Sequence, residues 1–209
     1  MSILDLETWP RKEHYHFFSQ FSEPFFGVCI DVDCTIAYQK AKDANTSFFL
    51  YYLHKSLMAV NKIDCFRYRI NADKQIVVHD KVSASATIGR ENGTFGFSYM
   101  PFDEDFETFR NSSNAEIERI QNTTNLFPDY IADDVIHYSS LPWLKFTSIS
   151  HARNLAFPDS VPKISFGKMV TDGISRRMPV SIHVHHALMD GLHVGEYVDL
   201  FQDLLNDQV

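Results

Sequence analysis

Residues 179–193 read PVSIHVHHALMDGLH, and this stretch decides more of the fold than any other. Its first half alternates with period two, which predicts a strand over 178–186. One face of that strand is mostly apolar and carries Val180, Ile182, Val184 and His186. The other face carries Ser181, His183 and His185. Asp190 and Gly191 then form a turn, and the following periodicity predicts an amphipathic helix over 192–206.

His186 is therefore expected to end a strand on its apolar side. A partly desolvated imidazole tends to stay neutral and able to accept a proton, which suits a general base. Two other interpretations stay open. A lone histidine on an apolar strand face is more often a hydrogen-bonded core residue. His183 and His185 point the same way and could hold zinc with His193 or a carboxylate, but no cysteine lies nearby and we expect no metal.

Strand-like and helix-like stretches are mixed along the rest of the chain, which predicts an α/β (α+β) fold. Strands are expected at 25–34, 64–70, 75–79, 84–88, 94–100, 135–140, 145–151 and 163–171. Asn45 to Ser47 can cap a helix that runs through FFLYYLHKSLMAVNK, and 103–121 reads as another helix. With 8 Gly and 8 Pro, no stretch reads as a linker, so we expect one domain over residues 1–209.

The composition excludes several functional classes. A net charge of −8 disfavours nucleic-acid binding, because an acidic surface repels phosphate backbones. No apolar run is long enough to span a bilayer, and residues 1–12 do not resemble a signal peptide. The three cysteines, at 29, 34 and 65, have no metal-type spacing, which is typical of reduced thiols in a cytoplasmic protein.

Several motifs, in the right order along the chain, carry a resemblance to a known family. His186-Ala-Leu-Met-Asp190-Gly191 fits the H-x-x-x-D-G motif of CoA-dependent acyltransferases, and the longer string 185–193 resembles the signature of chloramphenicol acetyltransferases. Trp9-Pro-Arg11-Lys-Glu-His14 is similar to the family's W-x-R-x-x-H, and residues 139–143 (SSLPW) to its S-x-L-P-W. Asn125-Leu-Phe-Pro128 also matches. The resemblance covers nearly the whole chain.

The resemblance implies a two-layer sandwich, with a mixed sheet and helices packed on it. It implies a homotrimer with active sites at the subunit interfaces, acetyl-CoA as co-substrate and a small-molecule acceptor. His186 would be the general base for acetyl transfer to a hydroxyl, and Ser139 would donate a hydrogen bond to the oxyanion. Asp190 would pair with Arg11 to hold the turn that carries His186. Gly191 is expected to supply a turn conformation that a side chain would forbid.

The resemblance also places residues in the two substrate sites. Trp143, Lys168 and Ser165 fall where the family binds CoA or the reaction intermediate. The acceptor pocket is expected to contain Phe17, Phe18, Phe26, Phe95 and His137. Several acceptor-pocket positions depart from the chloramphenicol enzymes: this chain has Ser22, Ala84, His137 and His151 where those enzymes have, respectively, an apolar residue, Gln, Asn and Leu. At the CoA site, Met169 stands in place of an aromatic residue that stacks on the adenine. A different acceptor, such as a sugar hydroxyl, and a non-catalytic binding protein therefore stay open; a dihydrolipoyl acyltransferase is disfavoured because no lipoyl domain precedes this one.

Overall fold

The computed structural model describes residues 1–128, 130, 133–155 and 159–208. Its larger sheet has seven strands, and a mixed pattern of pairing runs across it. The spatial order is β2 (Phe25–Asp33), β10 (Ser175–His185), β8 (Lys163–Phe166), β7 (Val135–Ser140), β5 (Ser83–Gly89) and β6 (Phe95–Phe97), with β9 (Val170–Asp172) on β10. Strands β5, β7 and β8 are parallel to one another, whereas β10 runs antiparallel to both β2 and β8. The mixed α/β sheet predicted from the sequence is therefore confirmed.

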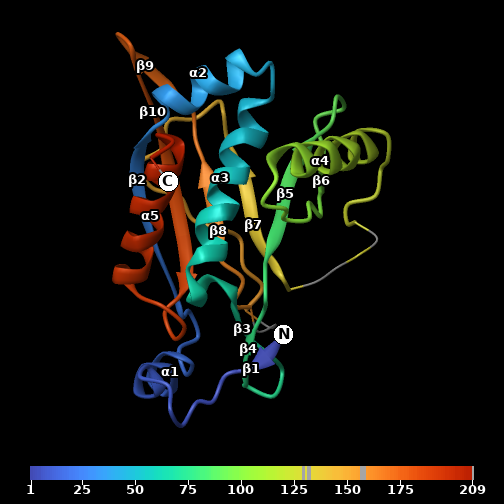
Figure 1. The fold of residues 1–209 in the computed structure, drawn as a ribbon. Helices are drawn as coiled ribbons and strands as arrows, with labels where there is room; N and C mark the ends of the chain where they lie inside the picture. The colour runs from blue at the N-terminus through green and yellow to red at the C-terminus, as the bar shows by residue number, and fades with distance from the viewer. Residues whose placement is uncertain (129, 131–132, 156–158, 209) are drawn as a thin grey trace.

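The helices and a second, smaller sheet complete the fold. In Figure 1, α3 (Phe48–Lys62) and α5 (Gly191–Leu205) lie in front of the large sheet, and α4 (Phe106–Gln121) lies beside β5 and β6. Helix α2 (Thr35–Asp43) packs on α3. The small sheet has the order β1 (Ser2–Ile3), β4 (Ile76–Val78), β3 (Tyr68–Ile70), and lies with α1 (Lys12–Phe18) at the end of the molecule where β10 finishes.

Helices α3 and α4 each begin at a residue whose side chain caps them. The Ser47 hydroxyl accepts from the backbone N–H of Leu50 (3.4 Å), which confirms the predicted start of α3. The Asp105 carboxylate accepts from the backbone N–H of Thr108 (2.8 Å). Helix α4 therefore starts at Phe106, three residues later than the 103 expected from periodicity alone.

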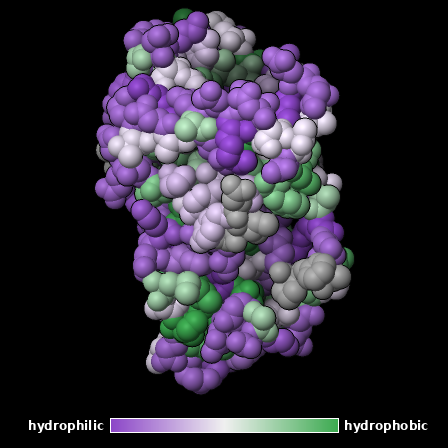
Figure 2. Space-filling model, turned by 90° about the vertical axis from the view of Figure 1, so that its right-hand side faces the viewer, coloured by the Kyte–Doolittle hydropathy of each residue, from purple (hydrophilic) through white to green (hydrophobic). Residues whose placement is uncertain are grey.

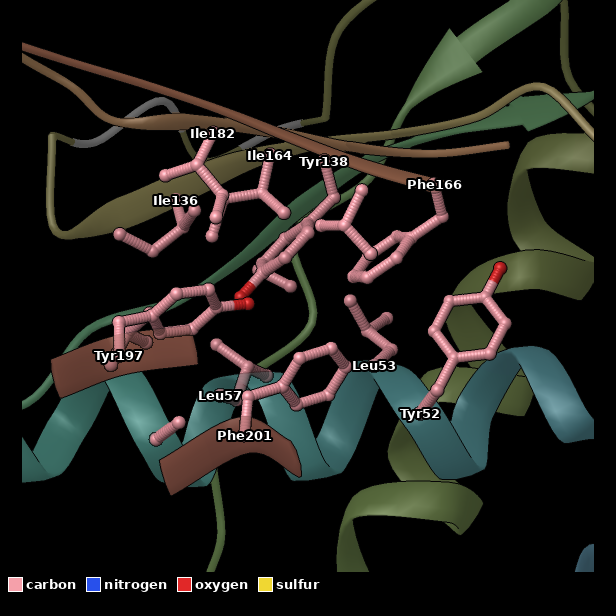
Figure 3. Close-up of a cluster of buried hydrophobic side chains, with 14 of the residues drawn as sticks. Tyr52, Leu53, Leu57, Ile136, Tyr138, Ile164, Phe166, Ile182, Tyr197 and Phe201 are labelled. Atoms are coloured by element: carbon pink, nitrogen blue, oxygen red, sulfur yellow. The ribbon is translucent and has the colours of Figure 1, made fainter. Parts of the chain in front are cut away.

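The two faces of the large sheet differ in chemistry. The face toward α3 and α5 is apolar, and Val180, Ile182 and Val184 of β10 are fully buried there. Figure 3 shows the Tyr138 and Tyr197 side chains meeting between the sheet and the helices. Both hydroxyls bond to the Ser56 hydroxyl of α3, at 2.8 and 2.7 Å, so this core contains its own polar network.

Three expectations about secondary structure need correction, and two helices were missed. No strand forms at 145–151, because β7 already pairs with β5 on one side and β8 on the other, which leaves that segment no neighbouring edge. The strand expected at 163–171 is broken at residues 167–169 into β8 and β9. The first half of 64–70 is a 3₁₀ turn, η1 (Asp64–Arg67). Helices α1 and α2 were not predicted, because each is shorter than ten residues and weakly patterned.

The outer surface agrees with the composition. The face in Figure 2 is mainly hydrophilic, and its hydrophobic residues form separate patches. None of the described helices combines the length and apolar character that crossing a membrane requires.

A buried arginine ties the small sheet to the large one. Arg69 of β3 is fully buried, and its guanidinium donates to four backbone carbonyls. Two of these belong to Phe66 (2.9 Å) and Tyr68 (2.6 Å). The other two belong to Asp133 (2.7 Å), which precedes β7, and Val135 (2.5 Å), its first residue. Burial lowers the pKa of Arg69 to about 10, so the group stays charged at neutral pH.

We expect Arg69→Met to lower the free energy of unfolding by about 2–3 kcal/mol, because several buried carbonyls lose their charged donor. Chemical denaturation of the two proteins measures the difference. Arg110→Met on α4 is the matched control, since this half-buried arginine pairs with Glu107 one helical turn away and no second ion pair is formed by it among the described residues. Equal losses in the two variants would contradict a structural role for Arg69.

Candidate active site

His186 follows the last residue of β10 and is held in a defined orientation. Its backbone N–H donates to the Pro24 carbonyl (2.9 Å). The imidazole stacks on Phe18, with ring centroids 3.9 Å apart and an interplanar angle of 15°, and touches Phe26 at 4.6 Å. Its Nδ1 lies 3.2 Å from the Met189 carbonyl oxygen. When Nδ1–H donates to that carbonyl, Nε2 carries the lone pair and can accept a proton.

An ion pair between two residues that are 179 positions apart in the sequence holds the turn after His186. Arg11 Nη1 donates to Asp190 Oδ2 at 2.5 Å, and Arg11 Nη2 donates to the His186 carbonyl at 3.3 Å. The pairing predicted between these two residues is therefore present. It fixes the N-terminal segment, the turn and the start of α5 to one another, and so fixes the backbone that carries the imidazole.

Asp190 also caps helix α5. Its Oδ1 accepts from the Leu192 backbone N–H (3.1 Å) and lies 2.9 Å from His193 Nδ1. Partial burial alone would raise the pKa of Asp190, but the Arg11 guanidinium outweighs it and lowers this pKa to about 2. The carboxylate is one-third exposed, at 33%, so losing it should cost less than losing a fully buried partner.

We expect Asp190→Asn to lower stability by about 1–2 kcal/mol and to lower activity with it, because the turn loses its ionic tie. Stability measured by thermal unfolding should differ from wild type at pH 7. The difference should shrink as the pH falls from the ordinary value of 3.8 through about 2, where wild-type Asp190 takes up a proton. Asp203→Asn, on the exposed side of α5, is the control. Lost activity with unchanged stability would contradict the structural role.

The reason given for Gly191 was wrong. Gly191 is the first residue of α5, its φ is not in the left-handed region, and a Cβ built on it meets nothing within 4 Å. A side chain is therefore allowed at this position. An Asp-Gly pair suggests a tight turn from sequence, but here the aspartate serves as a helix cap and the glycine simply begins the helix.

Polar side chains cover the face of the large sheet that lies away from the helices. Strand pairing aligns them in two rows across β5, β7, β8 and β10. One row contains Ser85, His137, Lys163 and His183. The other contains Ser139, Ser165 and Ser181. This polar face is where the sheet can meet a substrate.

A cavity of about 420 Å³ opens on this polar face. Ser139, His137 and Lys163 line it from the sheet, and His151 and Ala152 from the segment after β7. An aromatic wall faces them, in which Phe97 and Phe127 stack with centroids 5.6 Å apart. An apolar cavity with a few converging polar groups suits a small organic ligand. His186 is not among the described residues that line it.

The predicted acceptor-pocket residues fall into separate groups. His137 lines the cavity, whereas Phe18 and Phe26 contact the His186 ring instead. Phe17 is 59% exposed and packs edge-on against Phe18. Phe95 is exposed on β6, next to Phe97, which does line the cavity. Among Phe17, Phe18, Phe26 and Phe95, none lines this cavity within the described part of the chain.

The three residues expected at the CoA site differ in exposure. Trp143 is 78% exposed and Lys168 is also exposed, so both present their side chains to an incoming molecule. Ser165 is fully buried beside Ser139, and its hydroxyl has no hydrogen-bond partner among the residues that the structure describes. A buried hydroxyl without a partner is uncommon and marks a place where a water molecule or ligand can bond.

The other histidines of the motif do not converge. His193 bonds Asp190, and His183 packs edge-on against His151 with centroids 4.8 Å apart. His185 is buried against Phe25, and burial, with Arg153 nearby, lowers its pKa to about 4. The described residues contain no group of three or more His, Cys, Asp or Glu able to hold a metal ion.

Sequence reasoning missed most of the cavity wall. Phe97, Phe127 and Tyr130 come from a strand and a loop that only the tertiary fold brings together. Lys163 was also missed, although the alternation of residues 163–166 places it on the same face as Ser165. That alternation was the one available signal.

Comparison with known proteins gives a consistent result. The sequence model of the family described as "CAT: Chloramphenicol acetyltransferase" matches residues 1–202. The chain is 30% identical to a chloramphenicol acetyltransferase of Bacillus pumilus over 201 residues, covering 95% of this chain and 91% of that protein. It is 29% identical to chloramphenicol acetyltransferase 3 of Escherichia coli over 209 residues, covering 98% and 97%.

Solved structures agree with the sequence matches. A chloramphenicol acetyltransferase structure superposes with a TM-score of 0.89 at 33% identity, covering 98% of this chain and 99% of that one. A probable dihydrolipoamide acetyltransferase from Listeria monocytogenes superposes with a TM-score of 0.65 at 12% identity, covering 93% and 89%. At this low identity, the match to the dihydrolipoamide acetyltransferase shows only that the two chains share a fold.

Proposed function

This chain belongs to the chloramphenicol acetyltransferase family, whose model spans residues 1–202, and we propose that it moves acetyl from acetyl-CoA to a hydroxyl of chloramphenicol or a related small molecule, with His186 as general base. The family membership makes the chain an acyltransferase, and the family uses acetyl-CoA as co-substrate. The acceptor and the roles of individual residues are the proposal.

The observation that carries the mechanism is the contact of His186 Nδ1 with the Met189 carbonyl, at 3.2 Å. It leaves Nε2 free to take the proton of the acceptor hydroxyl as that oxygen attacks the thioester carbonyl. The stacked Phe18 and Phe26 rings keep the imidazole from rotating away. No acyl-enzyme forms, because the acceptor oxygen itself makes the new ester bond.

Ser139 is proposed to stabilise the charge that this attack creates. The carbonyl oxygen of the thioester becomes an oxyanion, and the Ser139 hydroxyl on the cavity wall donates a hydrogen bond to it. When the intermediate collapses, the C–S bond breaks and the CoA thiolate takes the proton from His186. The products are the acetyl ester and free CoA, and His186 returns to its neutral form.

The active site is proposed to form between subunits of a homotrimer. The cavity that contains Ser139 is not lined by His186 in the described part of one chain, so the two groups meet most simply across an interface. The exposed Trp143 and Lys168 are proposed to contact CoA, Lys168 through a phosphate, and the buried Ser165 hydroxyl to bond a water molecule that serves the intermediate.

The first test is thiol release from acetyl-CoA by the purified protein, with and without chloramphenicol. We expect release that depends on chloramphenicol and yields one acetyl ester per thiol. Release with other hydroxyl compounds but not with chloramphenicol would retain the chemistry and change the acceptor. No release with any hydroxyl compound would contradict the proposed function and favour a binding protein on this scaffold.

A further inference from the structure

The strand pair that carries His186 ends in a single hydrogen bond. Strands β2 and β10 are antiparallel, and Phe25 opposite His185 is the last pair in register at this end. One further bond extends the ladder, from the His186 backbone N–H to the Pro24 carbonyl at 2.9 Å. The last bonds of a ladder open more readily than those in its middle. The backbone that carries the imidazole therefore depends on what holds Pro24 in place.

Arg153 contacts the residues on both sides of Pro24. Its Nη1 forms an ion pair with Glu23 Oε1, and its guanidinium carbon lies 3.9 Å from the centre of the Phe25 ring. The same Glu23 oxygen accepts from the Phe25 backbone N–H at 3.2 Å. One guanidinium and one carboxylate thus tie residues 23 and 25 together and hold the Pro24 carbonyl between them.

The contact of Arg153 with Phe25 is better protected from water than the contact with Glu23. The Arg153 side chain is 13% exposed, whereas the Glu23 side chain is 53% exposed. An ion pair with a solvated carboxylate contributes little alone, because water screens it. A guanidinium over an aromatic ring gains more where water is excluded. The Phe25 ring also packs edge-on against His185, at a centroid distance of 5.4 Å, so it joins Arg153 to the residue before His186.

Arg153 reaches this strand end from the segment that borders the acceptor cavity. Residues 151–152 line the cavity of Ser139, and Arg153 is not among the described residues that line it. Arg153 instead lines a second cavity of about 430 Å³, together with Pro24 and His185. Its side chain is therefore placed to act on the support of the proposed base and not on a ligand in the Ser139 cavity.

We propose that Arg153 is a positioning residue for acetyl transfer, which fixes the Pro24 carbonyl through Glu23 and Phe25 and so fixes the backbone of His186. This inference rests on the proposed function, in which His186 is the general base. Misplacing a reacting group by about 1 Å can slow a reaction by about 10²-fold, so a small shift of this backbone reduces the rate. Substrate affinity, in contrast, should stay nearly unchanged.

Arg153→Met removes the charge and the donors but leaves an apolar side chain that can still cover Phe25. We expect kcat for thiol release from acetyl-CoA, with the hydroxyl compound that wild type acetylates, to fall about 10-fold. KM for acetyl-CoA and for the acceptor should change by less than about 2-fold. A raised KM for the acceptor with unchanged kcat would overturn the inference, because Arg153 would then shape the cavity wall.

Hydrogen exchange of the full-length protein, followed by NMR, tests the same contact without turnover. The His186 amide should exchange about 10-fold faster in Arg153→Met, since the Pro24 carbonyl is held less firmly. The amides of Val180 and Ile182, in the middle of β10, should keep their rates. Unchanged exchange at His186 would contradict the inference, and equally faster exchange along the whole strand would indicate general unfolding and overturn it.

Arg67→Met is the matched control. Arg67 is also mostly buried, with its side chain 18% exposed, pairs with Asp64 and donates to the His79 carbonyl at 2.9 Å. These contacts lie within η1 and just after β4, not in the ladder of β2 and β10. Thermal unfolding should show that both variants lose stability, but Arg67→Met should keep kcat and the exchange rate at His186. An equal fall of kcat in both variants would overturn the inference.

Glu23→Gln tests whether Glu23 and Arg153 act together. The amide can still accept from the Phe25 N–H but loses the charge that pairs with Arg153, so kcat should fall about 3-fold. The double variant Arg153→Met/Glu23→Gln should be no slower than Arg153→Met alone, because both changes act on one contact. A product of the two effects, about 30-fold, would contradict a shared route to His186.

The inference and the proposed function fail separately. Acetylation by wild type with an unchanged kcat in Arg153→Met would retain the function and overturn the positioning role. If wild type acetylates no hydroxyl compound, the proposed function fails, whereas faster exchange of the His186 amide in Arg153→Met would still support the contact that fixes this backbone.

Discussion

Replacing His186 by alanine should lower kcat for acetyl transfer by about 10²–10⁴-fold, the usual contribution of a positioned general base. The ring that is removed stacks on Phe18 and Phe26, and its Nδ1 faces the Met189 carbonyl. Since acetyl-CoA and the acceptor are proposed to bind mainly to other residues, KM for both should change much less. Steady-state thiol release, with KM measured for each substrate, checks both expectations.

The loss must be separated from a general effect of removing a half-buried aromatic ring. His186→Gln keeps a polar side chain of similar length but cannot act as a base near neutral pH, so its kcat should be as low as that of His186→Ala. Thermal unfolding of both variants should differ from wild type by about 1 kcal/mol or less. His14→Ala, on the exposed side of α1, should retain full activity. A glutamine variant with near wild-type kcat would disprove the base role.

Local features of the site were predictable because they depend on short stretches of sequence. Period-two alternation over 178–186 placed Val180, Ile182 and Val184 in the core, where they are fully buried. The strand is longer than expected, Ser175 to His185, because β9 pairs with its first residues. Both of its faces are covered, since Ser181 and His185 are buried as well. The alternation therefore identified which residues share a face of the strand, but not how far each face is exposed to solvent.

The ion pair of Arg11 with Asp190 was predicted for a different reason. The two residues are 179 positions apart, and no periodicity relates them. Only the resemblance of the Trp9–His14 segment to a family motif suggested the contact. The physical cause is tertiary, because Tyr15, Ile76, Ala187 and Leu188 form a separate apolar cluster that packs the N-terminal segment under the turn.

The cavity could not be predicted in the same way. Its aromatic wall depends on Phe97 in β6 and Phe127 in a loop, which meet only after β5, β6 and α4 have packed together. The phenylalanines named from sequence instead surround His186 or lie on the surface. With 18 Phe in the chain, residue type alone cannot distinguish a pocket from a core.

Replacing Ser139 by alanine should lower kcat by about 10²–10³-fold, because the oxyanion loses a positioned donor. Ser140→Ala is a control one residue away. The Ser140 hydroxyl lies on the opposite face of β7 and bonds the Tyr52 hydroxyl at 2.9 Å, so its loss should cost about 1 kcal/mol of stability and little activity. Unfolding and thiol-release measurements on both variants should therefore show opposite patterns. Similar activity losses in the two would contradict the oxyanion role.

The Ser139→Ala variant, combined with His186→Ala, also tests whether the active site is shared between subunits. His186→Ala and Ser139→Ala proteins, unfolded together in equal amounts and refolded, should form mixed trimers if the enzyme is a homotrimer. If His186 of one subunit acts with Ser139 of its neighbour, about a quarter of the sites receive both intact side chains, and activity returns to about that fraction of wild type. If each chain instead used its own pair, no mixture could restore a site. Because neither variant alone regains activity on refolding, recovery in the mixture distinguishes the two arrangements directly.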